Sequence, residues 1–190
     1  LADPIRELDC APGSDGACAL ILAGEERVRE AAREPVWIRG ISYAADWHYL
    51  GDRKLADPAH LTLAARRAYD QAGVADPAEE IDFVEVYDTY SYMEPLRREG
   101  LGLCAAGEGG RLTREGKTRA DGPLPVNVSG GVMSAHAVLV AGMVRVAEVV
   151  LQIRGTAGER QLDRARVGLA HGINGPCGQS HCVVVLSGTA

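Results

Sequence analysis

The stretch Pro125–Arg154, PVNVSGGVMSAHAVLVAGMVRVAEVVLQIR, decides the fold of this chain. Its first four residues are typical of a short strand, and the turn Ser129-Gly130-Gly131 leads into a long, mostly apolar helix. Paired glycines permit a sharp turn and the close approach of another group. Free N–H groups at the start of the helix can then receive an oxyanion or a carbonyl oxygen, with His136 in the first helical turn beside them. The stretch therefore predicts a strand–turn–helix unit that binds an acyl group.

Other apolar and β-branched runs, each bounded by turn residues, predict the remaining sheet. Helical periodicity lies between these runs, and such alternation indicates an α/β fold with a largely parallel sheet. The last two strands are close in sequence and should form an antiparallel hairpin, whereas residues 102–122 should form an exposed glycine-rich loop. The expected strands are Cys18–Leu22, Val36–Ala45, Ile81–Tyr87, Arg166–His171 and Cys182–Ser187, and the expected helices Glu25–Arg33, His60–Ala72 and Ser91–Glu99.

The sequence predicts two regions, of which only the second has the elements of a complete domain. Residues 1–34 contain one strand and one helix but no sheet of their own, so they resemble the end of a preceding unit. Residues 35–190 contain the elements of a full domain.

Composition excludes several classes of function. The chain has 190 residues and a net charge of −6, with no Lys/Arg stripe that could neutralise nucleic-acid phosphates. Its five scattered cysteines indicate reduced thiols in a cytoplasmic protein and show no metal-binding spacing. The apolar stretch 135–153 approaches membrane-spanning length, but Arg145, Glu148 and Gln152 interrupt it. A buried central helix is therefore expected there, and no membrane association.

Tyr87, Asp88 and Tyr90 follow a buried strand directly. In open α/β sheets, ligands bind beyond the carboxyl ends of the strands, so these side chains stand where chemistry would occur. A Tyr hydroxyl there can donate a hydrogen bond to an enolate or pass on a proton. The alternative is that Asp88 or Ser91 caps the following helix and the tyrosines only pack.

Two further histidine-containing segments are candidates. His136 can act as a general base or as a neutral donor, and otherwise is a hydrogen-bonded, half-buried side chain. The glycine-rich hairpin turn contains His171, Asn174, Gly175 and Cys177, and its amides can form part of an oxyanion hole. A structural role is the alternative for Cys177, and the histidine that enters the last strand, at position 181, is expected to be structural.

Taken in order, these segments resemble the carboxyl-terminal half of thiolases, nearest to the sterol-carrier-protein-type thiolases and the thiolase-like steroid side-chain aldolases. The similarity covers nearly the whole chain. It rests on DCAPGSDGACALILAGEE (9–26), DFVEVYDTYS (82–91), VNVSGG (126–131), LQIRGTAGERQ (151–161) and RVGLAHGINGPCGQSHCVVVL (166–186).

The resemblance implies a thiolase-like fold: one carboxyl-terminal half-domain with helices layered around a mixed five-stranded sheet. It also implies a carbon–carbon bond made or broken beta to a coenzyme A thioester, by thiolytic (Claisen) acyl transfer or by retro-aldol cleavage, as in lipid or steroid degradation. The family's nucleophilic cysteine belongs to the amino-terminal half and has no counterpart by motif here. The expected catalytic residues are Tyr87, His136, His171 and Cys177, and the expected binding residues are Asp88, Tyr90, Ser129, Gly130, Gly131, Asn174 and Gly175.

Two departures from the thiolase pattern favour the aldolase branch. Thiolases carry Gly-His-Pro after the Ser-Gly-Gly turn, whereas this chain has Ala135-His136-Ala137, and Tyr87 stands where thiolases place Asn or His. The alternative function is a non-catalytic thiolase-fold partner or scaffold. The resemblance further implies an acyl-CoA substrate, no bound cofactor or metal, and an amino-terminal half on the same precursor or a separate chain. The expected assembly is a homodimer or a complex with a zinc-ribbon and oligonucleotide-fold protein.

Overall fold

The computed structural model describes residues 3–28, 30 and 34–189. Its centre is a four-stranded mixed sheet in the order β1-β4-β3-β2. β1 pairs antiparallel with β4, β4 pairs antiparallel with β3, and only β2 and β3 run parallel. The strands are β1 (Trp37–Ala45), β2 (Phe83–Glu85), β3 (Val167–Asn174) and β4 (Ser180–Ser187). The antiparallel hairpin is confirmed, but the sheet is mixed rather than largely parallel.

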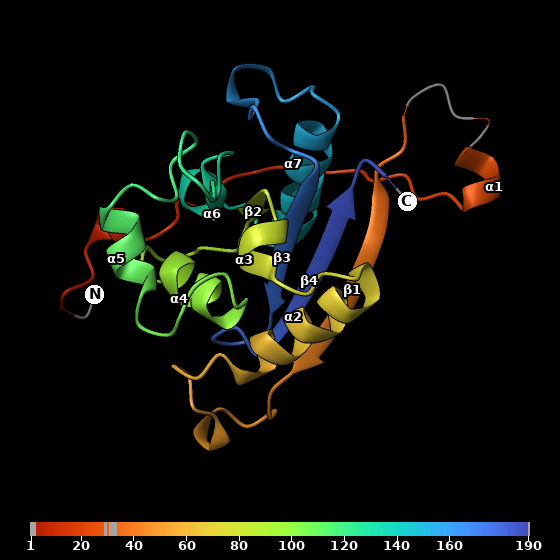
Figure 1. Cartoon of the computed structure of the whole chain (residues 1–190). Helices are drawn as coiled ribbons and strands as arrows, with labels where there is room; N and C mark the ends of the chain where they lie inside the picture. The colour runs from red at the N-terminus through yellow and green to blue at the C-terminus, as the bar shows by residue number, and fades with distance from the viewer. Residues whose placement is uncertain (1–2, 29, 31–33, 190) are drawn as a thin grey trace.

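The helices cover both faces of this sheet. Figure 1 shows α2 on one face and α7 on the other, with α4, α5 and α6 grouped beyond β2. Seven α-helices and three 3₁₀ turns are found in the described residues: α1 (Glu25–Val28), α2 (Ala59–Ala72), α3 (Pro77–Glu80), α4 (Met93–Gly100), α5 (Gly109–Arg114), α6 (Gly131–Ser134), α7 (Ala141–Ile153), η1 (Glu7–Asp9), η2 (Leu50–Asp52) and η3 (Gly158–Arg160).

Helix α2 packs directly on β1 and β4. Its buried stripe is Leu61, Ala64, Ala65 and Ala68, which gives one thin apolar face at helical spacing. The small side chains allow a close approach to the sheet, and a Cβ on Gly40 would collide with the carbonyl oxygen of Ala68. The predicted helix His60–Ala72 is therefore confirmed, and its alanine stripe sets the distance between helix and sheet.

β1 forms one edge of the sheet, and its edge is irregular. The register with β4 shifts between Ile38 and Gly40, as in a β-bulge. The amide of Ile41 donates to Oε1 of Gln71 on α2 at 2.9 Å. Part of the strand's outer edge is thus bonded to a side chain rather than to another strand.

The fifth strand expected from the resemblance is absent among the described residues. Pro125–Val128 contributes only an isolated parallel bridge between Val84 and Val126 beside β2. Cys18–Leu22 is extended but belongs to no strand, and Ile21 and Leu22 are 97% and 77% exposed. A strand needs a neighbouring strand to bond its backbone, and none lies beside residues 18–22 here.

The long helix expected after Gly131 is interrupted. Helix α6 ends at Ser134, Ala135 is extended, and α7 begins only at Ala141. His136 therefore lies in the connection between two helices and not in a first helical turn. Its carbonyl accepts the Ser14 amide at 3.2 Å, so an amino-terminal segment uses the backbone that a continuous helix would need.

Smaller corrections concern the remaining connections. The predicted loop 102–122 contains α5, which the buried Arg98 side chain of α4 binds through the Gly109 carbonyl and Thr113 Oγ1 at 2.7 and 2.6 Å. The predicted helix Glu25–Arg33 is described only as α1, and its residues 29 and 31–33 lie outside the described part. In the described residues, no helix has the length and apolarity needed to cross a bilayer.

Candidate functional site

Tyr87 and His136 form a short polar contact at the carboxyl end of the sheet. Tyr87 lies two residues after β2, and its Oη is 2.6 Å from Nε2 of His136. The two rings meet edge to face, with centroids 5.6 Å apart. The sequence places these residues 49 positions apart, and the fold brings them together.

The amino-terminal segment holds both members of this pair. The amide of Ala11 donates to the Thr89 carbonyl at 2.8 Å, and Ser14 donates to the carbonyl of His136. Ala11 also packs against the small buried cluster that contains Tyr87. Residues 9–14 therefore cross the site and fix the two backbones that carry the pair.

Burial lowers the pKa of His136 below its usual value, so the imidazole is neutral at neutral pH. A neutral imidazole can accept the Tyr87 proton at Nε2, or it can donate from Nε2, depending on its tautomer. The pair can accordingly hold one proton at either atom. This is the requirement for a group that takes up or releases a proton during a reaction.

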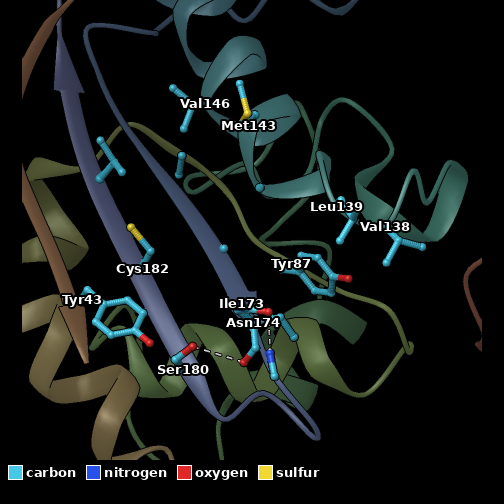
Figure 2. A pocket seen from close by; sticks show the side chains of 15 residues that line it. Tyr43, Tyr87, Val138, Leu139, Met143, Val146, Ile173, Asn174, Ser180 and Cys182 are labelled. Carbon is cyan, nitrogen blue, oxygen red and sulfur yellow. Dashed lines mark hydrogen bonds between the residues drawn. The ribbon is translucent and has the colours of Figure 1, made fainter. Parts of the chain in front are cut away.

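An open cavity of about 580 Å³ adjoins Tyr87. Figure 2 shows Tyr87 between Ile173 and the exposed Val138 and Leu139, with Met143 and Val146 of α7 farther along. The lining is mainly apolar, and Tyr87, Asn174 and Ser180 supply polar side chains. The cavity is lined by Tyr43, Tyr87, Val138, Leu139, Gly142, Met143, Val146, Ala170, Gly172, Ile173, Asn174, Gly175, Ser180, Cys182 and Val184.

The amides at the start of α6 are already bonded within the chain. Gly131 donates to Oγ of Ser129 at 3.2 Å, and Val132 donates to Oδ1 of Asp88 at 2.6 Å. Asp88 thus caps α6 rather than the helix that follows it in sequence. These amides are not free in this structure, contrary to the expectation of an open oxyanion site at the Gly130-Gly131 turn.

A buried network of charged side chains contacts the Ser129-Gly130-Gly131 turn. Oε2 of Glu85 accepts from Oγ of Ser129 at 2.6 Å and lies 3.2 Å from Nη1 of Arg145. Both the Glu85 and Arg145 side chains are almost completely buried. Burial raises the pKa of Glu85 to about 7, although Arg145 and Ser129 favour the carboxylate. Burial likewise raises the pKa of Asp88 to about 6.

His171 is fully buried and belongs to a histidine pair rather than to the cavity wall. Its Nδ1 accepts the Tyr87 backbone amide at 3.3 Å, and its Nε2 is 3.1 Å from Nδ1 of His181. Because an amide nitrogen only donates, the proton of neutral His171 lies on Nε2 and is donated to His181. His181 therefore carries its own proton on Nε2.

Both histidines are neutral. Burial, followed by the nearby Arg97 charge, lowers the pKa of His171 well below its usual value and that of His181 to about 3. His171 therefore orients the Tyr87 backbone without reaching the cavity. The expectation that this histidine stands among the reacting groups does not match its burial.

The other predicted residues are distributed unevenly. Asn174 and Gly175 line the cavity, whereas Tyr90 is stacked on Tyr92 at 5.9 Å and lies outside it. Cys177 is exposed on the hairpin turn and is not part of the cavity lining. The carbonyl of Cys177 accepts from Nη2 of Arg53 at 3.2 Å, which ties this turn to the loop before α2.

Sequence reasoning used Arg145, Glu148 and Gln152 only as interruptions of an apolar stretch and missed the buried ion pair of Glu85 with Arg145. Glu85 interrupts the apolar strand 81–87, and Arg145, Glu148 and Gln152 recur at helical spacing on the buried face of α7. A charged residue inside a buried strand and a polar stripe on an otherwise apolar helix were the available signals. In the described residues, no group of three or more His, Cys, Asp or Glu side chains could hold a metal ion.

Comparison with known proteins places this geometry in a family. The family described as "Thiolase C-terminal domain-like" matches residues 44–188. The chain belongs to this family. The matched region includes β2–β4, α2–α7 and every predicted site residue, and it begins at the last two residues of β1.

The relatives of this thiolase C-terminal-like chain are longer than the chain. An acetyl-CoA acetyltransferase of Methanothermobacter thermautotrophicus is 42% identical over 180 residues, which cover 94% of this chain and 46% of the relative. Sterol carrier protein 2 of Oryctolagus cuniculus is 34% identical, with 90% of this chain and 32% of that protein covered. The chain therefore spans about half or less of these relatives.

A solved structure gives the same picture. The Ltp2-ChsH2(DUF35) aldolase superposes with a TM-score of 0.83 and 27% identity, and the match covers 98% of this chain and 48% of that chain. The recognised thiolase resemblance is thus confirmed at the level of family and fold. The chain is homologous both to thiolase-family acyltransferases and to a thiolase-like aldolase.

Proposed function

We propose that this chain contributes half of an active site that makes or breaks a carbon–carbon bond beta to an acyl-CoA thioester. The single observation that carries the proposal is the 2.6 Å contact between Tyr87 and His136 beside the cavity. The similarity to an acetyl-CoA acetyltransferase and to an aldolase supports the substrate class. No cofactor is required, because the thioester itself stabilises the carbanion as an enolate.

Retro-aldol cleavage is the form of this reaction that suits the Tyr–His pair. A base removes the proton of the β-hydroxyl, the bond between the α and β carbons breaks, and a ketone or aldehyde leaves together with a thioester enolate. The enolate carbon then takes up a proton. Tyr87 would deliver that proton, and the proton taken from the β-hydroxyl would pass through His136 to the phenolate oxygen, so that no net proton is gained or lost. No acyl-cysteine is needed.

The remaining groups would bind rather than react. The apolar cavity lining would hold the acyl chain, and Asn174 and Gly175 at its wall would contact the polar end of the substrate. Ser129, Gly130, Gly131 and Asp88 would shape the turn beneath Tyr87. An amino-terminal half, on the same precursor or on a separate chain, would close the open side.

The decisive assay supplies the complete protein with a β-hydroxyacyl-CoA, and separately with a β-ketoacyl-CoA plus CoA. Cleavage of the first without the second supports the retro-aldol reaction. Thiolysis of the second assigns the chain to acyl transfer. Inertness toward both, in a folded and fully assembled protein, overturns the enzymatic proposal.

A non-catalytic partner or scaffold is the second candidate. It is favoured by the amides of Gly131 and Val132, which are bonded to Ser129 and Asp88 and therefore not offered to a substrate. Such a subunit would keep the fold and pair with an active chain. Inertness in the assay above, together with stable association with a catalytically active companion, would establish it.

A further inference from the structure

Two neighbouring arginines on α4 have opposite surroundings. The Arg98 guanidinium is paired with Glu94 and donates to the Gly109 carbonyl and to Thr113. Arg97 is also buried, at 6% exposure, yet no carboxylate of the described residues lies within 4.0 Å of it. Its Nε has no hydrogen-bond partner among those residues. Arg97 is therefore a buried cation without an internal counter-ion.

Burial of an unpaired charge is costly, so proteins normally supply an opposite charge. The groups that bear on Arg97 are His171, His181 and Tyr92, and none of them is a carboxylate. Burial lowers the pKa of the Arg97 guanidinium, which is the expected response to missing compensation. The balancing anion must come from outside the described residues.

A second unused donor lies beside Arg97. The hydrogen-bond order from Tyr87 through His171 leaves the proton of His181 on Nε2, and that atom has no acceptor in the described structure. A Cβ built on Gly178 would lie 3.0 Å from Nη2 of Arg97 and 3.6 Å from Cε1 of His181, the ring carbon next to Nε2. The Arg97 guanidinium and the His181 ring therefore both lie next to Gly178.

The hairpin turn is shaped to admit the Arg97 guanidinium. Cys177 and Gly178 both have positive φ, at 52° and 63°, and the absence of a side chain at Gly178 lets the guanidinium approach. Nη1 and Nη2 of Arg53 bind the carbonyls of Pro176 and Cys177 at 2.7 and 3.2 Å, which fixes the turn in place. The Arg53 hydrogen bonds and the contact of Arg97 with Gly178 thus both restrain this turn.

We propose that Arg97 and His181 bind an oxyanion, a phosphate or a carboxylate of a small-molecule ligand, next to Gly178. Ile173 borders both sides of this arrangement: its Cδ1 is 3.8 Å from the Cβ position of Gly178, and the residue lines the cavity beside Tyr87. A ligand bound in that cavity would thus be separated from Arg97 and His181 only by the Ile173 side chain. Assignment of the oxyanion to coenzyme A rests on the proposed function, whereas binding of the isolated anion does not.

The test measures the thermal midpoint of the full chain at pH 7.5 and constant ionic strength, in titrations with inorganic phosphate, acetate and CoA. A ligand at ~10 times its dissociation constant should raise the midpoint by roughly 3–5 °C. Arg97→Met should weaken binding at least tenfold while leaving the midpoint without ligand unchanged or higher. Arg97→Lys, which keeps the charge, should retain part of the response.

Arg114→Met removes an exposed arginine of α5 and serves as the matched control, with an unchanged response expected. A response to phosphate or CoA alone identifies a phosphate site, and a response to acetate alone identifies a carboxylate site. The proposal is overturned if none of the three stabilises the chain, or if Arg97→Met responds like the unsubstituted protein. Since no turnover is measured, failure of the enzymatic proposal would leave a positive result standing.

Discussion

At the residue scale, the proposed reaction depends on the position of Tyr87. Its backbone amide is bonded to His171 and its hydroxyl to His136, so both ends of the residue are fixed. Such double restraint orients a hydroxyl without the loss of side-chain entropy at each turnover. Tyr87 is thus suited to delivering a proton to one defined point.

Tyr87→Phe removes only the hydroxyl and should lower turnover of a β-hydroxyacyl-CoA roughly a hundredfold or more. The thermal midpoint should change little, because the ring still packs against Val132 and Ala141. Steady-state kinetics and a melting curve test this. Tyr92→Phe, at a half-exposed tyrosine outside the cavity, should leave both unchanged. Normal turnover with a large loss of stability would instead assign Tyr87 a packing role.

The buried carboxyls predict how stability depends on pH. Glu85 and Asp88 have folded-state pKa values raised to about 7 and about 6, above the unfolded values of 4.5 and 3.8. The native state therefore binds more protons than the unfolded state between these limits. The free energy of unfolding should fall as pH rises from 4.5 to 7, by up to about 1.4 kcal/mol per pH unit for each proton.

Urea denaturation at half-unit pH intervals measures this slope. Glu85→Gln cannot titrate and should flatten the curve most between pH 6 and 7, where most of Asp88 is already ionised in the native state. Glu79→Gln, at an exposed position of α3, is the control and should follow the unsubstituted curve. A slope of the opposite sign would mean that the Arg145 charge outweighs burial and keeps Glu85 ionised.

The site was only partly accessible from sequence. Tyr87 and His136 could be predicted because each follows a local signal, a strand end and a glycine turn. Their contact, the occupation of the α6 amides by Asp88, and the burial of His171 depend on partners 44 to 84 residues away. No local sequence pattern encodes contacts between residues that lie so far apart in the chain. Nothing in the sequence distinguishes Arg97 from the neighbouring Arg98.

At the element scale, the contact between α2 and β1 carries much of the sheet's stability. A Cβ at position 40 would collide with the Ala68 carbonyl and lie 3.3 Å from Cβ of Ala72. Since backbone cannot move aside as a flexible side chain can, Gly40→Ala should destabilise the chain by about 1–3 kcal/mol or more.

Chemical denaturation measures that loss. Gly24→Ala is the matched control, because a Cβ there would meet nothing within 4 Å, and it should change the midpoint little. Equal stability of the two variants would show that α2 can shift away from the sheet without cost.

Local elements were predictable and interrupted ones were not. Helix α2 has its apolar stripe and a terminal glycine within one segment, and the β3–β4 hairpin has its turn between its strands. The break between α6 and α7 has another origin, since the backbone of His136 pairs with Gly13 from the far end of the chain. A competing long-range pairing overrode helix propensity there.

At the scale of the whole molecule, the chain presents apolar surface that its own residues do not cover. Leu139 is 95% exposed and Ile21 97% exposed, on segments that the structure leaves open to solvent. The relatives are about twice as long or longer. An amino-terminal half that packs on these segments is the proposed partner.

Hydrogen exchange tests that assembly. Among the described residues, none of the amides of residues 15–23 donates a backbone hydrogen bond, so they should exchange within seconds in the chain alone. Addition of the amino-terminal half should slow their exchange at least tenfold as Cys18–Leu22 gains neighbouring strands. Val183 and Val185 in buried β4 should exchange slowly in both samples. Unchanged exchange at residues 15–23 would argue against the predicted boundary near residue 34.

The irregular border of β1 limits how copies of this molecule can meet. A regular, unoccupied border offers a template onto which a second molecule can add its own strand, and chains then grow into aggregates. Here the register shift between Ile38 and Gly40 distorts the edge of β1, and the Ile41 amide already donates to the Gln71 side chain. Association of copies through a continuous intermolecular sheet is therefore disfavoured on the β1 side of the molecule.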